Sequence, residues 1–129
     1  MPKAPTEWLL QPRLKKKPAK SHSRDPQDNP LFQEIWNVVA AIPRGQVSTY
    51  GAVARAAGLP GRARLAGRAL RESPREMHLP WHRVVGAGGR IVFPPSALAH
   101  REQTRRLRAE GVVVNEGRVE RSFLTDLEA

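Results

Sequence analysis

The stretch that decides the fold runs from residue 48 to residue 71 and reads STYGAVARAAGLPGRARLAGRALR. Ser48 or Thr49 can cap a short helix, because a side-chain oxygen at this position accepts a hydrogen bond from the first turn. We expect that helix to run through Ala57 and to end at Gly58, which suits the left-handed conformation that closes a helix.

A second short helix follows within the same stretch. Pro60 stands near its expected first turn, and the helix extends to about Arg71. Two short helices joined by a glycine-containing turn are typical of a helix-turn-helix. A longer amphipathic helix precedes the pair, starting at Asn29-Pro30 and ending before Pro43. Its apolar side chains recur at helical spacing: Phe32, Ile35, Trp36, Val39 and Ala40.

The chain becomes strand-like beyond these helices. Val84-Val85 and residues 91–93 flank a glycine-rich turn and predict a hairpin that forms a wing. Ser96 can cap a further helix over about residues 97–109, and residues 112–119 suggest a last small hairpin. The sequence therefore predicts a mainly α fold with a small β wing, a winged helix-turn-helix domain of the type that binds DNA.

Composition divides the chain into three parts. Residues 1–29 are basic and rich in proline, and we expect a disordered extension there. We expect residues 30–114 to form the winged-helix domain and residues 115–129 to form a C-terminal hairpin and tail.

The charge is large and unevenly distributed. The net charge is +10, and residues 44–108 hold 13 basic side chains, all arginine, against three glutamates. Residues 109–129 reverse the sign, with two arginines against five acids. A basic middle with an acidic end favours a defined polyanion-binding face. On composition alone, a solvated arginine-rich surface stays an alternative.

Several classes of function are disfavoured by what the sequence lacks. It has no cysteine, which excludes disulfides, thiolate metal sites and thiol nucleophiles. Its four histidines show none of the common zinc-ligand spacings, so we expect neither a metal nor another cofactor. No apolar run approaches the roughly 20 residues of a membrane span, and the N-terminus lacks a signal-peptide core. We therefore expect a cytoplasmic protein without a membrane partner, associated with the nucleoid in a bacterium.

The second helix of the pair carries the first candidate site. Arg64, Arg68 and Arg71 are spaced i, i+4 and i+7, so they share one stripe. Ala63 and Gly67 lie beside them, and such small residues let a helix approach a narrow minor groove. The arginines could then neutralise phosphates, and one could enter the base stack. The alternative is a solvated arginine face.

The second candidate site is the string Pro80-Trp81-His82-Arg83-Val84. Taken alone, it favours a buried aromatic residue beside an internally hydrogen-bonded histidine. It resembles, however, the Pro-Cys-His-Arg-Val signature of the O6-alkylguanine-DNA alkyltransferases, in which the cysteine accepts the alkyl group. Trp81 occupies that position here. Other segments are also similar to that family: residues 42–51, 60–70, 86–91 and 110–111.

The resemblance covers about residues 30–114, and the tryptophan form is similar to the cysteine-less alkyltransferase-like subfamily. It implies a protein that binds O6-alkylguanine in double-stranded DNA by nucleotide flipping and transfers no alkyl group, so that no residue is catalytic. It also implies that the bound lesion is presented to nucleotide excision repair proteins. We expect the protein to be a monomer.

The resemblance also implies roles for individual residues. Arg64 would enter the duplex in place of the extruded base, and Tyr50 would crowd the 3′ phosphate. Trp81 would line the lesion pocket with its apolar ring face. The remaining candidates would complete the pocket (His82, Arg83 and Val84) or contact the DNA (Ala63, Gly67, Arg68 and Arg71).

The departures from the enzymes concern their chemistry. Glu110-Gly111 matches the position of the glutamate that helps the enzymes' histidine to generate thiolate, so the pair of His82 and Glu110 survives with no thiol to activate. We expect this pair to be structural or to orient a donor towards the base. Ser73 replaces an asparagine of the enzymes' hinge. Residues 94–97 replace a Tyr-Ser-Gly-Gly type segment, which suggests a roomier pocket for larger adducts.

Two other interpretations stay open. A winged-helix transcription regulator would prefer a sequence in undamaged DNA and would usually dimerise on two half-sites. The small face of Ala63 and Gly67 argues against it, because major-groove readers project polar side chains. A glycosylase could use Glu110 and His82 to activate water, although nothing else in the sequence indicates base excision.

Overall fold

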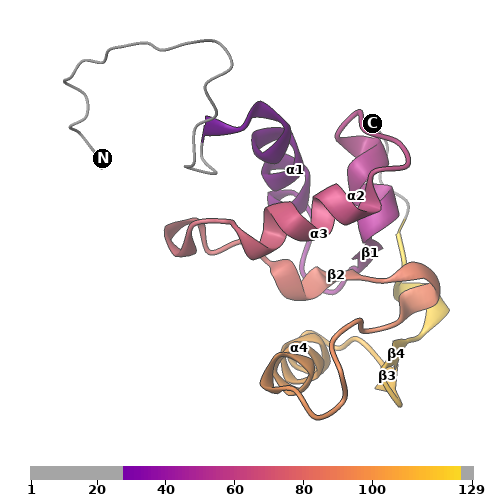
Figure 1. The fold of residues 1–129 in the computed structure, drawn as a ribbon. Coiled ribbons are helices and arrows are strands. Elements are labelled where there is room, and N and C mark those ends of the chain that lie inside the picture. The colour runs from indigo at the N-terminus through magenta and orange to yellow at the C-terminus, as the bar shows by residue number, and fades with distance from the viewer. Residues whose placement is uncertain (1–27, 126–129) are drawn as a thin grey trace, which may run out of the picture.

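The computed structural model describes residues 28–125, so the extension expected over residues 1–29 lies almost entirely outside the described part. Four α-helices, four short strands and short 3-10 helices make up this part (Figure 1). The helices are α1 (Pro30–Ala40), α2 (Tyr50–Ala56), α3 (Ala63–Arg71) and α4 (Leu98–Ala109). The strands are β1 (Ser48–Thr49), β2 (Val84–Val85), β3 (Val114–Asn115) and β4 (Arg118–Val119). The architecture is mainly helical, as predicted.

Helix α1 forms where the apolar periodicity predicts it. The Asn29 side chain caps it by accepting hydrogen bonds from the backbone N–H groups of Leu31, at 2.9 Å, and Phe32. Trp36 fixes the helix to α3, because its indole Nε1 donates to the Ala69 carbonyl oxygen at 2.8 Å. The apolar face of α1 is buried: Phe32, Ile35, Trp36 and Val39.

Helices α2 and α3 form the predicted helix-turn-helix. Thr49 caps α2, and its hydroxyl accepts a hydrogen bond from the Ala52 N–H at 3.1 Å. Gly58 closes the helix with a φ of +83°, as expected. Helix α3 begins later than predicted, at Ala63, because Gly61 has a φ of +82° and cannot belong to a right-handed helix.

The wing expected over residues 84–93 does not form as a hairpin. Strand β2 instead pairs in parallel with β1, with Ser48 opposite Val84. Residue Arg90 forms an antiparallel bridge with Arg118 of the C-terminal hairpin. Burial explains the difference: both residues of β2 have no exposed surface, and a strand covered on both faces suits an internal parallel pair.

Helix α4 and the C-terminal hairpin follow the prediction in outline. Ser96 does not cap α4, because a turn from the Pro94 carbonyl oxygen to the Ala97 N–H places Ala97 at the N-cap, without a side-chain hydrogen bond. Strands β3 and β4 form the expected antiparallel hairpin.

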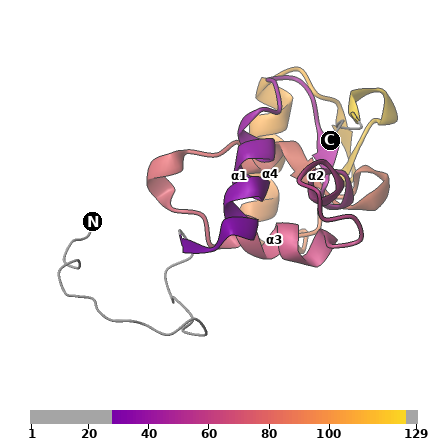
Figure 2. The ribbon, with the colours of Figure 1, turned by 90° about the horizontal axis from the view of Figure 1, so that it is seen from above.

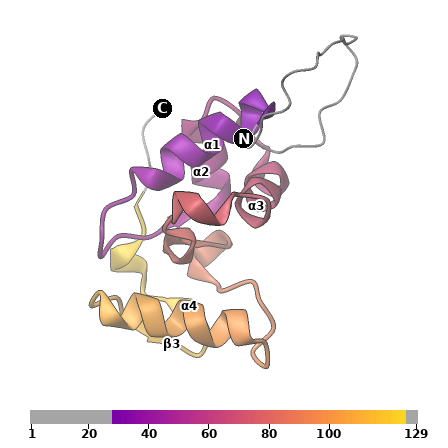
Figure 3. The ribbon, with the colours of Figure 1, turned by 90° about the vertical axis from the view of Figure 1, so that its left-hand side faces the viewer.

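Two apolar cores divide the described residues into halves. The first joins α1, α2 and α3, and the second joins α4 to β3 and β4. Neighbouring residues of β2 take part in different cores, Val84 in the first and Val85 in the second. Figure 3 shows α4 at the bottom of the molecule, below α1–α3, and in Figure 2, the view from above, α4 lies behind α1. No helix within residues 28–125 is long and apolar enough to cross a membrane.

Candidate nucleic-acid interface

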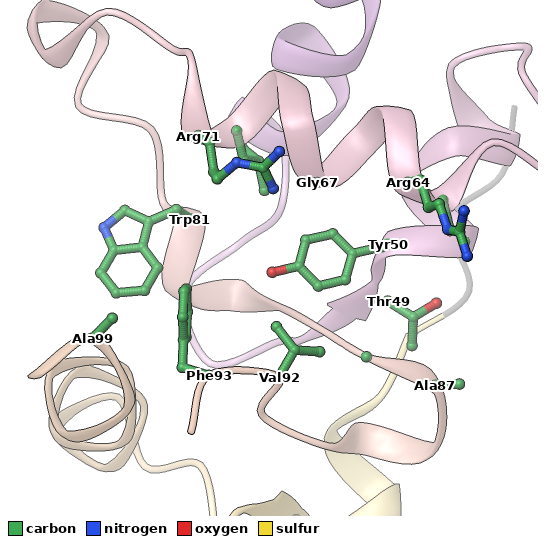
Figure 4. A pocket seen from close by; sticks show the side chains of 14 residues that line it. Thr49, Tyr50, Arg64, Gly67, Arg71, Trp81, Ala87, Val92, Phe93 and Ala99 are labelled. Atoms are coloured by element: carbon green, nitrogen blue, oxygen red, sulfur yellow. The ribbon is translucent and has the colours of Figure 1, made fainter. Parts of the chain in front are cut away.

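A cavity of about 840 Å³ lies between the two halves, beside α3 (Figure 4). Its upper wall comes from α3 and the start of α2, and its lower wall comes from α4 and the segment before it. The lining residues from the first half are Thr49, Tyr50, Gly51, Ala63, Arg64, Gly67, Leu70 and Arg71. The lining residues that come after α3 in the sequence are Trp81, Gly86, Ala87, Val92, Phe93 and Ala99.

Tyr50, the first residue of α2, lies against bare backbone of α3. A methyl group built on Gly67 would stand 3.8 Å from the Cδ1 and Cε1 atoms of the tyrosine ring, which is ordinary van der Waals distance. Burial raises the pKa of Tyr50, although the charge of Arg71 opposes this shift. The phenol is therefore protonated at neutral pH, and its hydroxyl can donate a hydrogen bond to an anion.

Two of the three predicted arginines border the cavity. Arg64 and Arg71 are exposed and stand towards opposite ends of its α3 wall (Figure 4). Arg68 does not line the cavity. Its Nε atom pairs with Glu72 at 3.1 Å, and its guanidinium lies 5.6 Å from the ring centre of Phe32 on α1. The three arginines therefore do not face one site: Arg64 and Arg71 border the cavity, and Arg68 lies against the first core.

Trp81 forms an aromatic wall of the cavity. Its ring meets Phe93 edge to face, with centroids 6.2 Å apart and planes at 88°. Val92, which is 51% exposed, lies beside this pair. Neither Val92 nor Phe93 was among the predicted site residues; the available signal was two apolar residues directly before Pro94-Pro95 in a chain with few aromatics.

The other three residues predicted for the lesion pocket do not line it. Val84 has no exposed surface and belongs to the first core. His82 is buried, and its Nε2 atom lies 2.7 Å from Oε2 of Glu110. Arg83 donates from Nη2 to the same oxygen at 2.8 Å, and from Nη1 to the Ile42 carbonyl oxygen at 2.8 Å.

Glu110, at the end of α4, is the centre of a buried polar network. Besides His82 and Arg83, it accepts a hydrogen bond from the Gly45 N–H at 3.1 Å. Burial alone would raise the pKa of this carboxyl group, but the hydrogen bonds from Arg83, His82 and Gly45 outweigh it and lower the pKa to about 2. The network joins α4 to the loop between α1 and β1 and to the short 3-10 helix Trp81–Arg83.

His82 is neutral in this network. Burial lowers its pKa, as do the charges of Arg83 and Arg106, against the opposing effect of Glu110. Because Glu110 is ionised, the imidazole proton lies on Nε2 and donates to the carboxylate. The predicted pair of His82 and Glu110 is therefore formed, and it holds two elements together in a chain that has no thiol.

These features are typical of a DNA-binding domain of the helix-turn-helix class. Its second helix borders a cavity that has two exposed arginines and an aromatic wall. Residues 30–112 match the family described as "6-O-methylguanine DNA methyltransferase, DNA binding domain". The chain belongs to that family, and within it to the alkyltransferase-like proteins, with Trp81 in place of the cysteine.

Named relatives agree with this assignment. The DNA base-flipping protein of Escherichia coli is 47% identical over 83 residues, which are 64% of this chain and only 63% of that protein. Alkyltransferase-like protein 1 of Schizosaccharomyces pombe is 39% identical over 84 residues, which are 65% of this chain and 78% of that protein. A crystal structure of S. pombe Atl1 in complex with damaged DNA containing O6-carboxymethylguanine superposes with a TM-score of 0.65. Its identity is 33%, and the alignment covers 74% of this chain and 94% of that one.

Proposed function

We propose that this protein recognises O6-alkylguanine in double-stranded DNA by rotating the damaged nucleotide into the cavity, without alkyl transfer. One observation carries the proposal: Tyr50, Arg64 and Trp81, which lie far apart in the sequence, line the same cavity. The E. coli relative is named for base flipping, and the S. pombe relative was crystallised with damaged DNA.

The α3 wall suits the approach of DNA. Ala63 and Gly67 leave the backbone nearly bare, which permits close contact with a minor groove. Arg64 and Arg71 supply positive charge at this wall, and among residues 28–125 no acidic side chain lines the cavity. Phosphate attraction would therefore bring the duplex to α3, largely independently of base sequence.

The residues at this wall support nucleotide flipping. Arg64 has no hydrogen-bond or ion-pair partner within residues 28–125, so its side chain is free to occupy the space that the extruded base leaves. Tyr50 lines the same cavity and could press on the neighbouring phosphate. Flipping costs a few kcal/mol and costs less at a damaged base, which supplies part of the selectivity.

The aromatic wall supports binding of the extruded base. Trp81 and Phe93 present ring surface, and aromatic contact with a base contributes roughly 1–3 kcal/mol. Alkyl transfer needs a nucleophile, and this chain has no cysteine in the cavity or elsewhere. We propose that the protein, acting as a monomer in the cytoplasm, instead presents the lesion to nucleotide excision repair.

A binding titration with product analysis tests the proposed function. Duplexes that differ only in one O6-methylguanine or guanine are titrated at one salt concentration, and protein and DNA are then weighed by mass spectrometry. We expect tighter binding to the damaged duplex and unchanged masses. Equal affinity would overturn lesion recognition and favour a transcription regulator, and a methylated protein or an excised base would overturn the non-enzymatic assignment.

A further inference from the structure

Arg106 of α4 covers a face of Trp81 without lining the cavity. The centre of its guanidinium lies 5.5 Å from the centre of the tryptophan ring system. Arg106 follows Ala99, a cavity residue, by two helical turns, so both project from the same side of α4. The indole is therefore enclosed by a cation on one face and by the edge contact with Phe93.

Glu102 holds this cation in place. Its Oε2 atom accepts a hydrogen bond from Nε of Arg106 at 2.6 Å, one helical turn away. The same oxygen accepts a hydrogen bond from Nη2 of Arg105, also at 2.6 Å, and Nε of Arg105 donates to Oε1 at 3.2 Å. Both arginines therefore pair with one carboxylate, but only Arg106 lies over Trp81.

We propose that Arg106, tethered by Glu102, is a positioning residue that clamps the indole of Trp81 and thereby sets the adduct size that the cavity binds best. A guanidinium over the face of an indole resists rotation of the ring, because rotation would break the cation–π contact. A fixed wall gives a small adduct a complementary surface. A bulky adduct needs the wall to move, and it must first displace Arg106.

The clamp has an expected signature in the free protein. With 5-fluorotryptophan incorporated, the Trp81 resonance in ¹⁹F NMR is assigned by its loss in Trp81→Phe. We expect this resonance to shift in Arg106→Ala and to stay in place in Arg105→Ala, which removes the same charge from the same carboxylate. Equal spectra for the two variants would overturn the clamp, and this readout requires no DNA.

A second experiment tests the effect on adduct size and rests on the proposed function. Affinities are measured for guanine, O6-methylguanine and O6-benzylguanine duplexes. From the size of a cation–π contact, we expect Arg106→Ala to weaken methyl-adduct binding by about threefold to tenfold relative to guanine. Binding of the benzyl adduct should fall less or rise, and Arg106→Lys should restore part of the methyl preference.

The outcomes separate the two proposals. If the wild type prefers neither adduct over guanine, the proposed function fails, whereas the NMR result still decides whether the clamp exists. If the wild type prefers the adducts but Arg106→Ala changes both affinities by one factor, or matches Arg105→Ala, the inference fails and lesion recognition stands. Unfolding curves of both variants identify any general loss of stability, which would lower all three affinities alike.

Discussion

Gly67 of α3 faces the ring of Tyr50 so closely that a single added methyl group would touch two ring carbons at 3.8 Å. This contact joins the two helices of the helix-turn-helix at the cavity wall. The contact does not itself require a glycine, because 3.8 Å is ordinary van der Waals distance and alanine would favour the helix. The small residue leaves room for a partner that approaches the backbone.

Gly67→Ala is therefore expected to separate stability from binding. Alanine in a helix interior is favoured over glycine by about 1 kcal/mol, and the contact with Tyr50 is not a clash, so the free energy of unfolding should rise. DNA affinity should fall for damaged and undamaged duplexes, because the methyl group fills the face that approaches the groove. Chemical denaturation and a duplex titration check the two effects. Unchanged affinity would contradict the placement of DNA on α3.

Arg64 and Arg68 form a matched pair on one helix, since both are exposed and only Arg64 lines the cavity. We expect Arg64→Ala to remove most of the preference for O6-methylguanine over guanine. Arg68→Ala should lower the slope of log affinity against log salt by at most about 1 while leaving that preference intact. Titrations at three salt concentrations measure both quantities. A lesion preference that survives in Arg64→Ala would contradict the role of Arg64 in replacing the extruded base.

Glu110→Gln should destabilise the fold, because it removes the charge that compensates Arg83, whose side chain is only 16% exposed. Breaking a buried ion pair by removing one partner costs about 3–5 kcal/mol. The side chain of Glu110 is 5% exposed, so solvent does little to screen this loss. The free energy of unfolding in urea measures the effect. Glu102→Gln, which removes a carboxylate from the surface of α4, is the control and should change stability little.

Stability should also depend on pH through the same network. The pKa of Glu110 is about 2 in the folded protein against 4.5 when exposed, so its contribution is present above pH 4.5 and is lost as the pH falls towards 2. Burial also lowers the pKa of His82 in the folded protein. As the pH falls below 6.5, the unfolded chain therefore binds a proton at this histidine before the folded protein does, and stability declines. Urea unfolding at pH 7, 5.5 and 3.5 follows both losses. A Glu110→Gln variant that loses as much stability as the wild type below pH 4.5 would contradict the role of this carboxylate.

Local signals account for the parts of the fold that the sequence predicted well. The Asn29 and Thr49 caps and the closing Gly58 each act within a few residues, and they place α1 and α2 where expected. The parts that differ depend on distant partners. Strand β2 pairs with β1, and Arg90 pairs with Arg118. Both partners lie far away in the sequence, so the pattern of apolar and polar residues over 84–93 does not predict either pairing.

The candidate site shows the same division. Tyr50, Arg64 and Trp81 were selected from sequence and lie around one cavity. Arg68 lies away from the cavity, where it pairs with Glu72 and contacts Phe32. Arg83 is half-buried and pairs with Glu110 instead of lining the cavity. Phe93 and Arg106 contact Trp81 only through tertiary packing, which no local sequence pattern predicts.

Nucleotide flipping is the central claim, and the most direct measurement places a fluorescent cytosine analogue opposite the O6-methylguanine. If the damaged nucleotide enters the cavity, the analogue loses its partner and its fluorescence rises when protein is added. The rise should be absent for a guanine duplex and reduced with Arg64→Ala, compared at saturating protein. Tight, lesion-selective binding with no change in this fluorescence would contradict the account.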